Sequence, residues 1–172
     1  MVRAALAGRK VGREPVPLAT LVPAASVVAA SALAVLPIVS ASGWWPNLGL
    51  LMLLGWRMLR ADAWPAWWAA PLGLVNDLLT GAPVGMSMAL WTALMLAMDI
   101  IDRRTQWRDY WIEWLVAALL LAFAAWVEAR VAALNGAPPL LTSTVPAAAI
   151  EILLFPLAAY AAMRIDRWRL GR

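Results

Sequence analysis

Basic residues occupy only alternate gaps between the long apolar stretches of this 172-residue chain. Six stretches come close to the roughly 20 residues that cross a bilayer as a helix, at residues 18–40, 44–60, 64–80, 84–101, 111–134 and 141–163. Of the 14 Lys and Arg residues, 13 lie in the two terminal segments and in the connectors 57–63 and 102–110. Because cytoplasmic loops carry an excess of Lys and Arg, this alternation predicts six transmembrane helices with both termini in the cytoplasm.

The composition agrees with a membrane protein, since 64% of the residues are apolar and only 14% are charged, against roughly 45–50% and 25% in soluble domains. We therefore expect an all-α integral membrane protein, a six-transmembrane-helix bundle in which spans two and three are the shortest. The predicted organisation is a cytoplasmic basic tail at 1–17, a transmembrane domain at 18–163 and a cytoplasmic basic C-terminus at 164–172. The first apolar stretch is longer than the 7–15 residues of a signal peptide, which favours a retained anchor over a cleaved one.

The chain has no Cys and no His, which excludes thiol nucleophiles, disulfides and the usual zinc ligands. The net charge of +4 could suggest nucleic acid, but the arginines sit where membrane orientation requires them. We expect no nucleic-acid partner, no cofactor, no metal and no catalytic residues.

Ionisable side chains inside transmembrane spans are costly and are functional candidates by default. They are Asp77 in span three, Glu128 and Arg130 in span five, and Glu151 in span six. The predicted topology places all four in the outer half of the membrane or near its midplane, where they could form one polar cluster with Arg130 neutralising a carboxylate. They could serve as helix-to-helix contacts, as a proton or ion relay, or as a docking site for a partner's transmembrane helix.

Small residues recur at helical spacing in span one, where Ser26, Ala30 and Ala34 form a stripe. Small side chains let helix backbones approach closely in lipid. The stripe could serve packing within the protein or contact with a partner.

The segment 76–85, at the turn between spans three and four, is the most distinctive of the chain. Gly81 permits a backbone conformation that ends a helix, Pro83 suits the first turn of the next helix, and Gly85 allows close approach. Asp77 could reach the membrane surface or cap the backbone locally. The residues predict a tight helical hairpin.

Asp77, Leu78, Leu79, Gly81, Pro83 and Gly85 together follow a D-L-L-x-G-x-P-x-G pattern, which resembles the signature of the rod shape-determining protein MreD family. Asn76 stands where an apolar residue is more usual. The resemblance implies a protein of the bacterial inner membrane with no established chemistry, similar in architecture to the substrate-binding subunits of energy-coupling-factor transporters. It implies association with an MreC-type protein and, through it, with MreB, RodA and the elongation transpeptidase.

The expected function is a non-enzymatic scaffold of the cell-wall elongation complex that maintains rod shape. The alternative is a small-molecule-binding subunit of a vitamin-type transporter, for which the intramembrane charges would form a polar pocket. The connectors without basic residues are short, which leaves little material outside the membrane to recognise a hydrophilic solute. A pore is a third possibility, although the spans lack the repeated polar lining that conduction requires.

Overall fold

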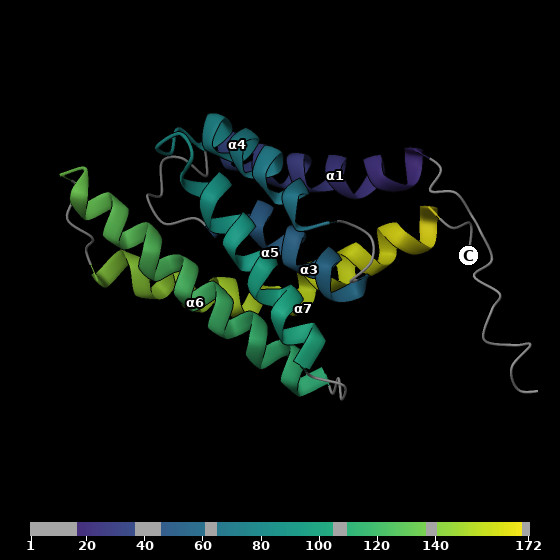
Figure 1. The fold of residues 1–172 in the computed structure, drawn as a ribbon. Helices are drawn as coiled ribbons and strands as arrows, with labels where there is room; N and C mark the ends of the chain where they lie inside the picture. Colours follow the sequence, from purple (N-terminus) through teal and green to yellow (C-terminus); the bar gives the residue numbers. More distant parts are fainter. Residues whose placement is uncertain (1–16, 37–45, 61–64, 105–109, 137–140, 170–172) are drawn as a thin grey trace, which may run out of the picture.

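The described part of the chain is entirely helical (Figure 1). The computed structural model describes residues 17–36, 46–60, 65–104, 110–136 and 141–169. These residues form six α-helices and two short 3-10 helices without any strand: α1 (Pro17–Ala32), η1 (Leu33–Val35), α3 (Leu48–Leu59), η2 (Ala66–Trp68), α4 (Ala69–Thr80), α5 (Met86–Arg104), α6 (Tyr110–Leu134) and α7 (Leu141–Arg169). The predicted all-α class is confirmed.

Successive helices run in opposite directions (Figure 1). Helices α1, α4 and α6 run from right to left in that view, and α3, α5 and α7 run from left to right. We call the left side the hairpin end, because α4 turns into α5 there. The right side is the terminal end, since α1 begins there and α7 finishes there (Figure 1).

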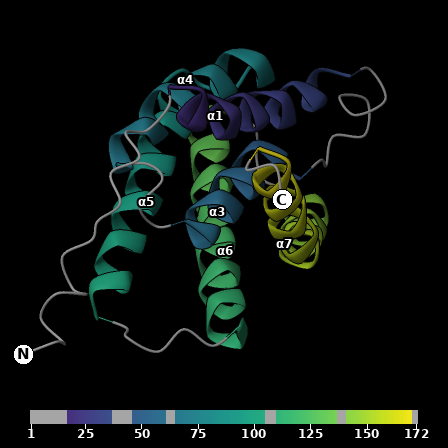
Figure 2. The ribbon, with the colours of Figure 1, turned by 90° about the vertical axis from the view of Figure 1, so that its right-hand side faces the viewer.

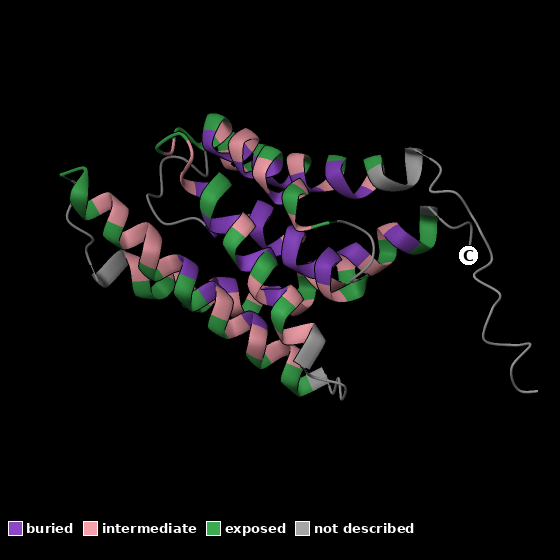
Figure 3. Ribbon diagram, viewed as in Figure 1, coloured by how far each residue is buried: buried purple, intermediate pink, exposed green. Residues whose placement is uncertain are grey.

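Helix α3 lies at the centre of the molecule. It packs against α1 on one side and α7 on another, while α4 packs against α5, and α6 against α7. Figure 2 shows α1 and α4 lying across the top of the other helices, with α7 seen end-on. Most of α3 is buried (Figure 3), including every residue from Gly49 to Arg57 except Met52. The core is therefore built around α3, a helix of only 12 residues, and not around the long helices α6 and α7.

The observed helices follow the predicted apolar stretches, with differences of several residues at their ends. The first α-helix stops at Ala32 and is extended only by η1, whereas α7 continues to Arg169, six residues past the predicted boundary at 163. The extension is held because Asp166 is buried and bonded to α3. The predicted basic tail 1–17 falls outside the described residues except for Pro17, as does the predicted connector after the first span.

Two helices are long and apolar enough to cross a membrane unaided. They cover Trp111–Leu134 in α6 and Thr144–Trp168 in α7. The apolar helices Leu21–Val35 and Leu48–Leu59 are shorter. At about 1.5 Å per residue, the 12 residues of α3 extend about 18 Å, well below the roughly 30 Å of a hydrocarbon core. A short helix can still lie at membrane depth when protein surrounds it, because its polar ends are then satisfied by neighbouring helices.

Candidate functional site

The hairpin between α4 and α5 is closed by the carboxylate of Asp77. Its Oδ2 accepts a hydrogen bond from the Gly85 backbone N–H, and its Oδ1 accepts one from the Ser87 N–H, both at 2.9 Å. Gly81 ends α4 in the left-handed conformation, with φ 70°. A side chain from one helix thus satisfies the unpaired N–H groups at the start of the next, where negative charge is stabilised. Asp77 is a cap across the hairpin and is almost completely buried.

Asn76, the polar residue beside it, also joins the two helices. Its Nδ2 donates to Ser87 Oγ at 3.1 Å, deep in the structure. The same side of α4 carries Gly73, where an added Cβ would lie 2.6 Å from the backbone of Ser87 and Met88. The two helices therefore meet at backbone distance, and the polar Asn76 side chain fits this site because α5 supplies a hydroxyl for it.

Asn47 holds two carboxylates together at the hairpin end. Its backbone N–H donates to Glu151 Oε1 at 2.7 Å, and its Nδ2 donates to Glu128 Oε1 at 3.5 Å. Its Oδ1 accepts from the Leu50 N–H at 3.1 Å and so caps the start of α3. We call Asn47, Glu128 and Glu151 the carboxylate cluster. It joins the beginning of α3 to α6 and α7.

The predicted polar cluster is thus only partly assembled. Glu128 and Glu151 come together, while Asp77 is committed to the start of α5. Arg130 does not join them: its guanidinium carbon lies 5.4 Å from the centre of the Trp126 ring, on an exposed part of α6. Among the described residues, the carboxylates at the hairpin end are stabilised by helix N-termini and an asparagine instead of by a cation.

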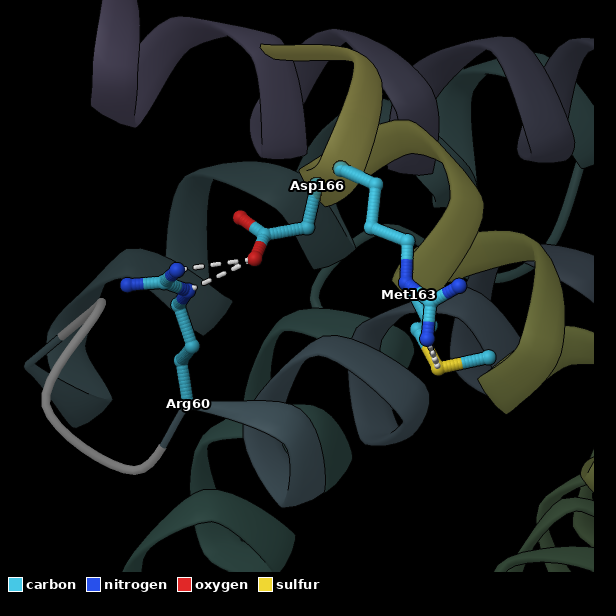
Figure 4. Close-up of polar contacts among 4 residues, drawn as sticks. Arg60, Met163 and Asp166 are labelled. Atoms are coloured by element: carbon cyan, nitrogen blue, oxygen red, sulfur yellow. Dashed lines mark hydrogen bonds and ion pairs between the residues drawn. The ribbon is translucent and has the colours of Figure 1, made fainter. Parts of the chain in front are cut away.

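The terminal end carries the ion pairs. Buried Arg57 contacts Asp99 at 2.5 Å and Asp102 at 2.8 Å, which ties α3 to α5. Arg60 donates from Nε and Nη2 to Asp166 at 3.0 and 2.8 Å, which ties α3 to α7 (Figure 4). We call these five residues the arginine layer.

Most of the arginine layer was not predicted from the sequence. Arg57 and Arg60 were counted with a connector, but Arg57 lies in the last turn of α3 and is 3% exposed. Two features of the sequence point to this ion pair. Asp99 and Asp102 are three residues apart and so share one helix face, and a cation such as Arg57 is favoured at the C-terminus of a helix. Asn47 had a signal as well, because Asn before an apolar run is a common helix cap.

The small-residue stripe on α1 faces the protein interior at two of its positions. Ser26 Oγ accepts a hydrogen bond from Trp56 Nε1 at 2.8 Å and donates to the Pro23 carbonyl at 2.7 Å. Ala30 is buried, whereas Ala34 lies half-buried in η1. Ser26 and Ala30 therefore serve the contact between α1 and the rest of the bundle.

These groups connect helices, and their geometry does not match a metal centre. Among the described residues, no group of three or more Asp and Glu side chains could hold a metal ion. The chain matches no protein-family model, no curated protein and no solved structure.

Proposed function

We propose that the chain is a six-span protein of the bacterial inner membrane, related to MreD, with both termini in the cytoplasm. In this proposal it is a non-enzymatic scaffold of the cell-wall elongation complex. It binds an MreC-type protein and, through that protein, MreB, RodA and the elongation transpeptidase. The hairpin end then faces outward and the terminal end inward.

The α4–α5 hairpin is the observation that carries this proposal. Asp77 caps α5, Gly81 and Gly85 have the positive φ angles of 70° and 94° that favour glycine, and the Pro83 carbonyl accepts from the Met86 N–H at 3.0 Å. Asp77, Gly81, Pro83 and Gly85 therefore all serve to form the turn. A signature made of turn-forming residues fits a protein that acts by binding partners through its surface and not by a reactive group.

The carboxylate cluster and the arginine layer, two polar layers at opposite ends of α3, support the proposal of six spans. Asn47 and Arg57 are ten residues apart, a rise of about 15 Å along α3, roughly half the ~30 Å hydrocarbon thickness. Both layers would then lie below the headgroups, where polar groups must be satisfied by protein. Hydrogen bonds and ion pairs within each group meet this requirement for the carboxylates of Glu151 and Asp99 and for Nη2 of Arg57, whereas Arg57 Nε and Nη1 are buried without a hydrogen-bond partner among the described residues. These contacts are consistent with a 12-residue helix in the centre of a membrane bundle.

The carboxylate cluster favours one alternative function, a small-molecule-binding subunit of a transporter. It gathers two acidic side chains from different helices beside a capping amide, which could recognise a polar solute. Native mass spectrometry of the purified protein would detect a bound metabolite under this alternative. A metabolite lost in Glu151→Gln and retained in Thr92→Val would favour the transporter.

Co-purification tests the scaffold proposal. The full chain, tagged and co-expressed with an MreC-type protein in a rod-shaped bacterium, is expected to recover that protein in mild detergent. Depletion of the chain is expected to make the cells round. Recovery of no morphogenetic protein, together with unchanged rod shape after depletion, would contradict the proposal.

A further inference from the structure

Helix α6 uses only a narrow stripe for packing within the protein. Ala117, Leu121 and Ala124 are buried, whereas much of the remaining surface of the helix is half-buried or exposed (Figure 3). On its exposed side, Leu119, Phe123, Trp126 and Arg130 follow one another at intervals of four, three and four residues. We call these four residues the α6 outer face. This spacing is that of a seam along which a second helix packs.

Three side chains of the α6 outer face, those of Phe123, Trp126 and Arg130, are stacked on one another. The Phe123 and Trp126 rings lie 6.1 Å apart at 28°, and the Arg130 guanidinium lies 5.4 Å from the Trp126 ring centre. Trp126 is eight residues from the end of α6 at Leu134, a rise of about 12 Å. Tryptophan prefers the membrane interface, so an exposed tryptophan at this depth is better placed against protein than against lipid chains.

Arg130 carries a charge that the described residues do not balance. The ion pairs of the described chain involve Arg57 and Arg60, and Arg130 is in none of them. Glu128 is two residues away and is bonded to Asn47. An unpaired arginine in the bilayer interior is costly, and the cation–π contact with Trp126 offsets only part of that cost. The guanidinium also lies over a ring one turn back along α6, away from the nearer helix end, which is the wrong direction for a headgroup phosphate.

We propose that the α6 outer face docks a transmembrane helix of a partner protein that carries an Asp or Glu at the level of Arg130. The inference rests on the proposed function, because it takes α6 as a membrane span of a scaffold. Among the described residues at the hairpin end, a second copy in the same membrane orientation offers no unbonded carboxylate: Asp77 and Glu151 are buried and Glu128 is bonded to Asn47. The aromatic rings give the contact its area, and the charge pair fixes its register.

Photo-crosslinking and charge reversal test the docking face. The photoreactive residue p-benzoylphenylalanine is placed at position 126, or at position 153 as a control, in the full chain co-expressed with the MreC-type protein. Leu153 is a matched control because it is 72% exposed and, like Trp126, stands two residues from a member of the carboxylate cluster. We expect a crosslink to the partner's transmembrane helix from position 126 and little from position 153.

Arg130→Gln is expected to lower recovery of the partner at least about tenfold, as loss of one member of a buried charge pair does. Arg130→Glu should abolish recovery, and exchange of the partner's carboxylate for Arg should restore it. Normal recovery with Arg130→Gln, lipid adducts alone at position 126, or a crosslinked helix without Asp or Glu at that level would each overturn the docking face. Those outcomes leave the scaffold proposal intact if the unaltered chain still recovers the partner, whereas no recovery with the unaltered chain contradicts both.

Discussion

The buried charges of this protein are stabilised in two different ways, according to the end of the bundle they occupy. At the hairpin end, Asp77 and Glu151 accept hydrogen bonds from backbone N–H groups at or beside the first turns of α5 and α3. Those groups are unpaired within their own helices and carry partial positive charge. At the terminal end, Asp99 is paired with Arg57. An aspartate is therefore stabilised by a cation at the terminal end, as Asp99 is, and by the N–H groups of a helix start at the hairpin end, as Asp77 is.

Replacement of Asp77 by Asn tests the cap. An amide keeps one acceptor oxygen but turns an NH2 toward the second N–H donor, so one buried backbone group loses its partner. We expect Asp77→Asn to lower the free energy of unfolding by about 1–3 kcal/mol, measured by denaturant titration in detergent with circular dichroism. Thr92→Val is the control, since it removes a hydrogen bond to Met88 within a single helix. Equal loss in both variants would show that the contact across the hairpin has no special role.

At the scale of helices, α3 is the element on which the others converge. It is only 12 residues long, yet its beginning is bonded to α6 and α7 and its end to α5 and α7. Gly55 adds a close approach to α7, because an added Cβ would lie 3.3 Å from the Ala158 carbonyl oxygen and the Ala159 Cα. The polar contacts at both ends fix how far α3 can slide along its neighbours, which apolar packing alone leaves loosely determined.

The two arginines of α3 should differ in their importance. Arg57→Met leaves Asp99 and Asp102 without the guanidinium between them, and loss of one partner of a buried ion pair costs about 3 kcal/mol or more. Arg60→Met should cost less, about 1–2 kcal/mol, because the Arg60 side chain is 41% exposed and water screens the pair from that side, while its partner Asp166 is 10% exposed and loses two hydrogen bonds. Denaturant titration of both variants in detergent gives the comparison.

A compensating variant separates the ion pair from simple packing. Addition of Asp99→Asn and Asp102→Asn to Arg57→Met removes the two negative charges that Arg57 contacts and is expected to recover most of the lost stability. If the triple variant is no more stable than Arg57→Met alone, the loss comes from the shape of the arginine side chain and not from its charge.

At the scale of the whole molecule, the bundle has two chemically distinct ends. The carboxylate cluster lies at the hairpin end and the arginine layer at the terminal end. The first described residue of α1 and the last of α7 lie at the terminal end, and the α4–α5 turn lies at the hairpin end (Figure 1). Within the described ranges, α6 and α7 are the helices that are both long and apolar enough to cross a bilayer alone. Whether the α4–α5 hairpin also crosses the bilayer is therefore a direct test of the six-span topology.

Cysteine labelling answers that question, because the chain has no cysteine of its own. Single variants Thr80→Cys, Asn135→Cys and Arg167→Cys place a thiol on exposed residues at the hairpin end twice and at the terminal end once. With six spans, a membrane-impermeant maleimide added to intact spheroplasts should label positions 80 and 135, and position 167 only after lysis. Labelling of 135 without 80 would indicate that the α4–α5 hairpin does not cross the membrane and would contradict six spans.

Much of the fold followed from local features of the sequence. The length of each apolar stretch located the six helices, and Gly81 and Pro83 located the hairpin, because helix formation and helix ends depend on neighbouring residues. The choice of candidate side chains was less complete. Glu128 and Glu151 were two of four residues expected to form a cluster if they met, and both contact Asn47, which the sequence did not single out. The arginine layer was not predicted either.

The amino-acid sequence by itself determined where the helices lie, the turn between α4 and α5, and the placement of basic residues in alternate gaps, since each depends on residues close together in the chain. Tertiary structure decided which charges meet. Asn47 and Glu151 are 104 residues apart, and Arg60 and Asp166 are 106 apart. The direction in which a side chain leaves its helix, inward for Arg57 and outward for Arg130, is fixed by rotation of one helix against another, which only the packed core sets.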